Sequence, residues 1–210
     1  MLKEVCVENF TKVPEVIAKG ADRIELCDNL AAGGTTVSHG VAEVTINYCR
    51  SNDVQVMTMI RPRGGDFVYG KEEIEIMKRD LVHVKNLGTD GVVLGCLDAD
   101  GCIDEQAMSG LLDLAKGLEV TFHMAFDEIR PENQFKAIDW LAEHGVERIL
   151  THGGPLATKI EQNLVRLKEY IAYANDKIII LPGGGITTKN LTSITSALNI
   201  REVHGTRIVD

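Results

Sequence analysis

The sequence has few of the features that mark membrane, secreted or nucleic-acid-binding proteins. No apolar run approaches the ~20 residues that a membrane-spanning helix needs, and no basic-then-apolar signal peptide opens the chain. Lysine and arginine number 22 against 31 aspartates and glutamates, so the net charge of −9 gives no general support to nucleic-acid or anionic-membrane binding. We therefore expect a soluble, cytoplasmic protein with no nucleic-acid or membrane partner.

Cysteine is scarce and follows no disulfide or zinc pattern. The set is odd in number, scattered and without a CxxC motif: Cys6, Cys27, Cys49, Cys96 and Cys102. Reduced thiols are therefore expected rather than a disulfide framework. Linkers and low-complexity segments are also lacking. A chain of 210 residues with 44% apolar and 25% charged side chains suits one globular domain spanning 1–210.

Strand-like and helix-like segments alternate along the chain, which predicts βα units around a parallel sheet. Helical patterns separate eight strand-like segments, at 3–8, 23–27, 54–61, 91–97, 119–126, 148–152, 177–181 and 202–204. The stretches GADRIEL, GTDGVVL and GVERILT each place a glycine and then a carboxylate before every second strand, and NIREVH is a weaker fourth copy. The glycine suits a left-handed turn from helix into strand. This symmetry predicts an α/β fold of the TIM (β/α)8 type, a closed barrel rather than an open doubly wound sheet.

The end of the chain departs from an ideal barrel. Only six residues follow His204, too few for an eighth helix. The apolar outer face of the last and first strands would then lie bare unless something covers it. Because a large exposed apolar patch usually marks an interface, we expect a homo-oligomer.

The alternation of side chains along the strands predicts which residues face the barrel interior. In VTFHMAFD (120–127), Val120, Phe122, Met124 and Phe126 form an apolar face for the helices, and the residues between them point inward. The same reasoning places six ionisable side chains on the axis, mostly near the catalytic, C-terminal end of the strands: Glu8, Glu25, Arg61, His123, Asp127 and His204. We interpret them as candidate catalytic residues. The alternative is a ring of ion pairs that only fills the barrel.

Arginines and glycines at the same mouth predict a site for a small anionic ligand. The segment MTMIRPRGGDF (57–67) turns from a buried strand into Arg61, Arg63 and two glycines. We interpret the arginines as anion clamps or as partners of the inward carboxylates. Glycine-rich turns after the seventh and eighth strands stand where many barrels bind phosphate through backbone N–H groups, and their glycines are Gly183, Gly184, Gly185 and Gly205. Plain tight turns are the alternative.

The stretches EVCVEN, GADRIELCDNLAAGGTTVS, MIRPRGGDFVY, VTFHMAFDE, LPGGGIT and EVHGT resemble, in order and spacing, the CutC family over nearly the entire chain. The resemblance implies a cytoplasmic TIM-barrel protein linked to copper homeostasis and proposed to bind Cu(I), with no established reaction and no organic cofactor. The family's proposed copper ligands match Cys6 and Cys27, which the strand alternation also points inward. Thiolates are soft ligands suited to Cu(I), and Met57 or Met59 could add a thioether. Cysteines that merely pack are the alternative.

Two functions are therefore left open by the sequence. The first is copper homeostasis through Cys6 and Cys27. The second is a barrel enzyme of the isomerase, epimerase or lyase type, acting on a small anionic or phosphorylated substrate with Glu25 or His123 as general base. Met124 and His152 stand where many members have arginine and serine, so a catalytic arrangement carried over from them is incomplete here.

Overall fold

The strands and helices alternate as the sequence predicts. The computed structural model describes residues 1–210. The strands are β1 (Leu2–Glu8), β2 (Arg23–Cys27), β3 (Gln55–Met59), β4 (Gly91–Leu94), β5 (Glu119–Phe122), β6 (Arg148–Thr151), β7 (Ile179–Pro182) and β8 (Glu202–Gly205). The helices are α1 (Val13–Ala18), α2 (His39–Arg50), α3 (Lys71–Leu87), α4 (Glu105–Ala115), α5 (Gln134–Glu143), α6 (Leu164–Ala174) and α7 (Leu191–Leu198), with short 3-10 turns η1 (Leu30–Ala32), η2 (Met124–Glu128) and η3 (Ile160–Gln162).

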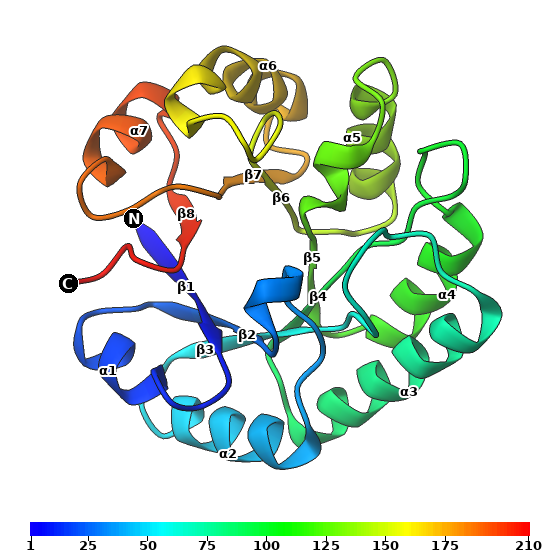
Figure 1. Cartoon of the computed structure of the whole chain (residues 1–210), viewed down its shortest axis with the longest axis vertical. Coiled ribbons are helices and arrows are strands. Elements are labelled where there is room, and N and C mark those ends of the chain that lie inside the picture. The colour runs from blue at the N-terminus through cyan, green and yellow to red at the C-terminus, as the bar shows by residue number, and fades with distance from the viewer.

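The eight strands form one parallel sheet that is nearly closed into a barrel. Their order is β7-β6-β5-β4-β3-β2-β1-β8, and every pair of neighbours is parallel. Just beyond the two terminal strands, Thr187 and Arg207 form an isolated parallel bridge between them. Figure 1 shows the seven helices in a ring around the strands, with the C-terminal segment lying between α7 and α1. The predicted (β/α)8 barrel without an eighth helix is confirmed.

The glycine–carboxylate repeat has the same structural role in its three full copies. Gly20, Gly88 and Gly145 have φ of +89°, +83° and +75°, the left-handed conformation in which glycine avoids a Cβ clash. The carboxylate two residues later accepts a hydrogen bond from the backbone of the preceding strand: Asp22 from Lys3, Asp90 from Val56 and Glu147 from Val120, with N···O distances of 2.8, 2.8 and 2.5 Å. The repeat therefore ties each second strand to the one before it.

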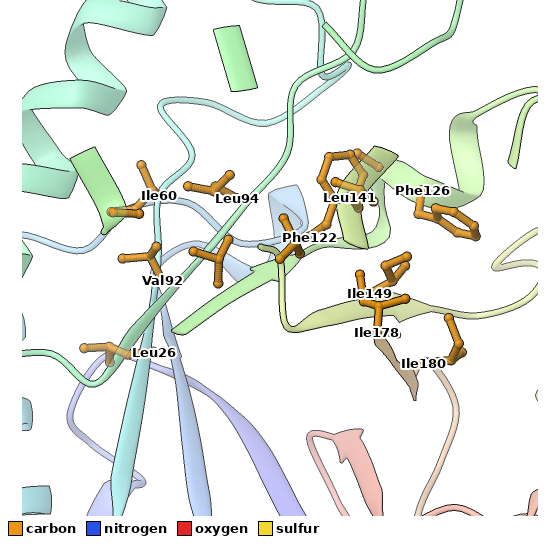
Figure 2. Close-up of a cluster of buried hydrophobic side chains, with 14 of the residues drawn as sticks. Leu26, Ile60, Val92, Leu94, Phe122, Phe126, Leu141, Ile149, Ile178 and Ile180 are labelled. Atoms are coloured by element: carbon orange, nitrogen blue, oxygen red, sulfur yellow. The ribbon is translucent and has the colours of Figure 1, made fainter. Parts of the chain in front are cut away.

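An apolar layer between the barrel and its helices forms the main core. Figure 2 shows strand residues such as Leu26, Val92, Phe122 and Ile180 pointing into this layer toward the helices. Val120, Phe122 and Phe126, which were predicted to face the helices, belong to it. Cys49 and Cys96 are also buried in this layer, and all five cysteines are free thiols, as predicted.

The expected bare face over strands β8 and β1 is not found. Val5 and Val203 on these strands are 1% and 0% exposed, because the residues after β8 fold back and bury Ile208 beside them. The amide of Thr188 donates to the carbonyl of Arg207 (3.0 Å) and fixes this segment to the loop before α7. The groove of about 550 Å³ that is left there is mostly polar, with Lys12, Lys19, Lys189 and Arg207 among its lining residues. The argument for a homo-oligomer from an exposed apolar face was therefore wrong.

No helix in the chain has both the length and the apolar character that a membrane crossing requires.

Candidate metal and acid-base site in the barrel

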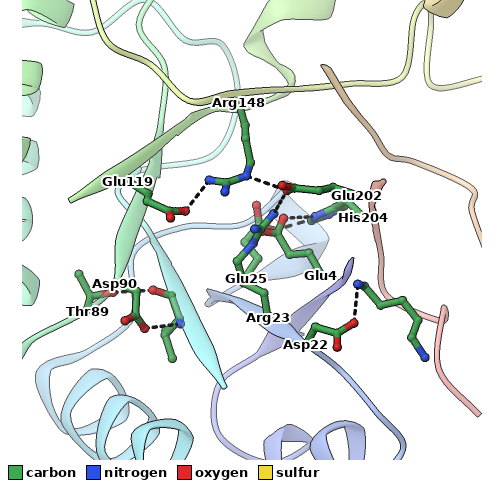
Figure 3. Close-up of polar contacts among 12 residues, drawn as sticks. Glu4, Asp22, Arg23, Glu25, Thr89, Asp90, Glu119, Arg148, Glu202 and His204 are labelled. Carbon is green, nitrogen blue, oxygen red and sulfur yellow. Dashed lines mark hydrogen bonds and ion pairs between the residues drawn. The ribbon is translucent and has the colours of Figure 1, made fainter. Parts of the chain in front are cut away.

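Ion pairs fill the N-terminal end of the barrel interior. Arg23, Glu119, Arg148 and Glu202 are the first residues of their strands, and Glu4 completes the set (Figure 3). The guanidinium of Arg23 pairs with Glu4 and with Glu202 (Nη2–Oε2 2.7 Å), and that of Arg148 pairs with Glu202 (2.8 Å) and Glu119 (2.6 Å). A structural ring of ion pairs therefore exists in the barrel, but it is built from residues other than the six catalytic candidates. Arg23 and Arg148 were missed, although Arg23 lies two residues before the inward Glu25 and has the same parity.

His204 joins this layer to the next one. Its Nδ1 lies 2.8 Å from Glu4 Oε1 and its Nε2 lies 3.8 Å from Glu25 Oε2. Burial alone would lower the pKa of His204, but the two carboxylates and a contact with Cys6 hold that pKa well above the ordinary value. Burial would likewise raise the pKa of Glu4, yet His204 and Arg23 hold it at about 2. His204 is therefore an imidazolium shared by two carboxylates.

A buried sulfur cluster lies beside Glu25 and His204. It consists of Cys6, Cys27, Met57 and Met59, with Val93 packed among them. The two thiol sulfurs are 4.0 Å apart, and Cys27 Sγ lies 3.5 Å from Glu25 Oε2. The sulfur and oxygen atoms of Cys6, Cys27 and Glu25 are close enough together to hold one metal ion. The inward placement of both cysteines and of Glu25 is as predicted.

The surroundings of both thiols favour their protonated forms. The hydrogen bond with Cys27, together with burial, raises the pKa of Cys6 well above its usual range. The same contact lowers the pKa of Cys27, but burial and the Glu25 carboxylate outweigh it and raise that pKa to about 11. A soft cation would have to displace these protons in order to bind.

The loop between β2 and α2 (residues 28–38), which contains η1, covers the sulfur cluster, and we call it the lid loop. Gly33 and Gly34 have φ of +84° and +88°, and Leu30 packs against the cluster. A Cβ on Gly34 would lie 3.2 Å from Cys27 Sγ and 3.6 Å from Met59 Cε. The backbone at Gly34 is therefore the lid directly above the sulfur atoms, and a side chain at this position would press on them.

Arg61 holds this loop in place. The side chain is 3% exposed, and its Nη1 donates to the carbonyls of Ala32 and Gly34, both at 2.9 Å. Nη2 donates to the carbonyl of Gly65 (2.8 Å), and the guanidinium stacks over Phe67. Only Nε has no protein partner. The role of Arg61 as an anion clamp stays a prediction, and it would rest on that one nitrogen.

Glu8 and Arg63 are both bound by other groups of the chain. Glu8, the last residue of β1, is exposed and accepts a hydrogen bond from the amide of Leu30 (2.7 Å), which anchors the lid loop, and its catalytic role stays a prediction. Arg63 pairs with Glu73 and with Asp66 (3.0 Å), so acidic groups of this chain already occupy its guanidinium. These contacts raise the pKa of Arg63. The proposed role of Arg63 in binding an external anion is therefore not supported, because Glu73 and Asp66 already neutralise its guanidinium.

The fifth strand ends earlier than the sequence predicts, and this changes its site residues. β5 stops at Phe122, and 124–128 form η2, so the alternation fails beyond His123. His123 is buried, and its Nδ1 accepts a hydrogen bond from the amide of Ala125 (3.2 Å). Burial lowers the pKa of His123 to about 3, and the charge of Arg61 adds to this effect. The ring is neutral, and its Nε2 has no protein partner.

Asp127 binds the C-terminal end of the neighbouring strand β6 and does not point toward the barrel axis. Its carboxylate accepts hydrogen bonds from Thr151 Oγ1 (2.5 Å) and from the amides of His152 (2.8 Å) and Gly153 (3.2 Å). Burial raises its pKa despite these hydrogen bonds. Met124, expected to face the helices, lies instead close to Gly183 and Gly184. Both expectations were wrong because η2 turns the chain out of the strand.

The glycine-rich turns approach the barrel closely. A Cβ on Gly183 would lie 2.6 Å from Leu150 Cδ1 and 3.0 Å from His204 Cδ2, and one on Gly205 would lie 2.8 Å from Ile208 Cγ2. Gly184 and Gly185 adopt φ of +78° and +82°. The next helix, α7, begins only at Leu191, after a turn in which Asn190 Oδ1 accepts a hydrogen bond from the amide of Thr187 (2.8 Å). Packing thus explains Gly183 and Gly205, and phosphate binding stays a prediction.

Comparison with known proteins places the chain in a family. The model of the CutC family matches residues 1–209. The CutC family protein of Enterococcus faecalis is 60% identical over 209 residues and is covered completely, as is this chain. A human protein named copper homeostasis protein cutC homolog is 41% identical, over 97% of this chain and 72% of its own. The chain belongs to the CutC family.

The family's fold agrees with the barrel described above. The crystal structure of CutC from Streptococcus agalactiae superposes with a TM-score of 0.97 at 42% identity, and the match covers 100% of both chains. Family membership, which the motifs EVCVEN and MIRPRGGDF suggested, is therefore confirmed together with the fold.

Proposed function

We propose that this chain is a cytoplasmic copper homeostasis protein that binds Cu(I) through Cys6 and Cys27. One observation carries the proposal: four sulfur-bearing side chains, Cys6, Cys27, Met57 and Met59, share a single buried cluster on three neighbouring strands. Thiolates and thioethers are soft donors, which favour Cu(I) over hard cations such as Mg²⁺ and Ca²⁺. The copper role in the names of curated relatives supports the same conclusion.

The spacing of the thiols fits one ion. A metal–thiolate bond is roughly 2.3 Å long in zinc sites, so one ion can bridge sulfurs up to roughly 4.6 Å apart. Cys6 Sγ and Cys27 Sγ are 4.0 Å apart. Met57 and Met59 border the same space and offer thioether donors. The cluster therefore suits a low-coordinate soft cation without rearrangement of the strands.

Residues beside the cluster would accept a proton released by the thiols and control entry of the ion. Glu25 Oε2, 3.5 Å from Cys27 Sγ, is placed to accept the proton that a cation displaces. Because the lid loop covers Cys27, the ion must enter when this loop opens, and Arg61 and Glu8 hold it closed. Copper is thus bound as cargo in a dry site from which water is excluded.

Titration of the reduced protein with Cu(I) against a competing chelator tests the proposal. The parent should bind one equivalent, and Cys6→Ser/Cys27→Ser should lose that equivalent. Cys49→Ser/Cys96→Ser is the matched control, since these two cysteines are equally buried but lie in the outer core. Equal binding by the parent and the Cys6→Ser/Cys27→Ser protein would exclude the thiol site.

A second candidate function rests on a different observation. Glu25 Oε1, Arg61 Nε, Thr121 Oγ1 and His123 Nε2 are buried polar atoms without a protein partner. Because unpaired buried polar groups are costly, such atoms often mark a polar ligand. They are compatible with an enzyme on a small anionic substrate, in which Glu25 or His123 exchanges a proton and Arg61 contacts the anion. The catalytic set is smaller than the sequence suggested, since Glu8 and Asp127 have structural partners.

A thermal-shift screen with small phosphorylated and carboxylated metabolites tests this second candidate. A true substrate should raise the melting temperature of the parent but not that of Arg61→Gln or His123→Asn. If no compound distinguishes the parent from these variants, the enzymatic candidate is wrong.

A homo-oligomer remains a prediction with no identified interface.

A further inference from the structure

A pair of exposed histidines lies on two helices outside the barrel. His39 is the first residue of α2, and His83 lies in α3. Nδ1 of His39 and Nε2 of His83 are 2.8 Å apart, and the rings are tilted by 50° with centroids 4.8 Å apart. Both residues are exposed. Two imidazole nitrogens from separate helices therefore converge on one point at the surface.

Glu43 lies near the ring nitrogen of His39 that does not face His83. It lies one helical turn further along α2, and its Oε2 is 3.6 Å from Nε2 of His39. This separation is too long for a hydrogen bond, but a small rotation of either exposed side chain would bring the carboxylate within reach of an Nε2–H. The lone pair of His39 would then lie on Nδ1, the nitrogen that faces His83. A carboxylate behind a histidine is the usual outer partner of a metal-binding imidazole, because it fixes the tautomer and raises the basicity of the ligand nitrogen.

The surroundings of His83 are of mixed charge, with Lys78, Arg79 and Glu75 lining the same groove. Asp80 precedes His83 by one turn of α3, and burial raises the pKa of Asp80 while the charge of His83 opposes this. Arg79, also one turn before His83, is paired with Glu75 (3.0 Å), so its charge is already compensated. A cation held between the two rings would thus have Glu43 and Asp80 as acidic neighbours and no free guanidinium, while the ammonium of Lys78 is the basic group in the same groove.

We propose that His39 and His83 form a surface site for a borderline divalent cation such as Zn²⁺ or Cu²⁺, with Glu43 as the group that orients His39. In a tetrahedral site, metal–imidazole bonds of roughly 2.0–2.1 Å hold two ligand nitrogens roughly 3.3 Å apart. The separation found is 2.8 Å. Exposed rings can make the small remaining adjustment by rotation. The donors are nitrogen and oxygen, so this site selects a different class of ion from the buried sulfur cluster.

Zinc titration of the full chain carrying Cys6→Ser/Cys27→Ser, which removes the competing thiols, tests the proposal by calorimetry and by imidazole NMR signals. One equivalent of Zn²⁺ should bind and shift the signals of His39 and His83. His39→Gln or His83→Gln should weaken this binding at least tenfold, and Glu43→Gln should weaken it about tenfold. His144→Gln is the matched control, an exposed histidine whose Nδ1 contacts only the carbonyl of Trp140.

Two results would overturn the proposal. In the first, Zn²⁺ leaves the imidazole signals of His39 and His83 unchanged. In the second, Zn²⁺ binds with the same affinity in the parent background and in both histidine variants. In either case the 2.8 Å contact is a hydrogen bond between two rings and nothing more.

Discussion

The thiol sulfurs of Cys6 and Cys27 lie 4.0 Å apart on adjacent strands of the barrel, under a loop whose Gly34 backbone rests on Cys27. This relationship joins the fold to the proposed function. The parallel register sets Cys6 beside Glu25 and Glu8 beside Cys27. As a result, the carboxylate of Glu25 lies next to the thiols of the cluster. Glu8, at the end of β1, instead accepts the hydrogen bond from Leu30 that anchors the lid loop.

We expect Gly34→Ala to disturb the copper site more than a comparable change elsewhere. Gly34 has φ of +88°, and its new Cβ would lie 3.2 Å from Cys27 Sγ. Gly117→Ala is the matched control, because Gly117 has φ of +91° and no atom within 4 Å of a built Cβ. Both variants should lose about 1–2 kcal/mol of unfolding free energy from backbone strain.

Only Gly34→Ala should also change Cu(I) affinity, by tenfold or more, in a chelator-competition titration. If the two alanine variants bind Cu(I) equally, Gly34 is not part of the lid over the sulfur atoms.

Arg61→Gln should open the lid loop. The substitution removes the donors to Ala32 and Gly34, so Cys27 should become accessible more often. In a Cys102→Ser background, we expect the rate of Cys27 modification by a thiol reagent, followed by peptide mass spectrometry, to rise at least tenfold. Arg63→Gln, which leaves these hydrogen bonds intact, should react like the parent. Unchanged Cys27 reactivity in Arg61→Gln would show that other contacts close the loop.

The ion pairs at the N-terminal end of the barrel should be essential to stability. Arg23→Met leaves the buried Glu4 and the half-buried Glu202 with one cation fewer. Removal of one member of a buried pair typically costs about 3–5 kcal/mol. We expect a loss of this size in urea unfolding, whereas Arg79→Gln, which breaks an exposed pair, should change stability by about 0.5 kcal/mol or less. A loss below about 1 kcal/mol for Arg23→Met would contradict this account of the ring.

His123 should make the fold sensitive to mild acid. Its pKa is about 3 in the folded chain against 6.5 for the free side chain, so the unfolded state takes up a proton more readily. The stabilisation is therefore complete above pH 6.5 and is lost as the pH falls from 6.5 toward 3. Between pH 6.5 and 4.5 this group should account for about 2–3 kcal/mol of the lost unfolding free energy.

His123→Asn, which can still accept the hydrogen bond from Ala125, should reduce the loss between these two pH values by that amount in urea unfolding. His144→Asn should not reduce it. Parallel pH profiles for the parent and His123→Asn would contradict the neutral, buried state of His123.

The sequence predicted the parts of this molecule that depend on local periodicity. Strand alternation correctly placed Cys6, Cys27, Glu25 and His204 inside the barrel, because all four lie within regular strands. It failed for Asp127, where the chain leaves the strand and enters η2. Side chains alternate between the two faces only while the backbone is extended. The residue types alone do not reveal that the extended strand ends at Phe122.

Contacts between distant segments were beyond the reach of the sequence. Arg61 was read as a ligand for an external anion, but backbone carbonyls of the η1 loop occupy its terminal nitrogens. A carbonyl acceptor leaves no trace in the sequence, so a buried arginine bound to backbone resembles an arginine waiting for a ligand. The meeting of His39 and His83 depends in the same way on how α2 packs beside α3.

The copper coordination itself tests the central claim most directly. X-ray absorption at the copper K-edge of the Cu(I)-loaded chain should show sulfur ligands at bonding distance. In Cys6→Ser/Cys27→Ser those ligands should disappear, and Cys49→Ser/Cys96→Ser should give the parent spectrum. Copper bound only by nitrogen and oxygen in the parent protein, or by sulfur in the Cys6→Ser/Cys27→Ser protein, would contradict the assignment of the buried sulfur cluster as the Cu(I) site.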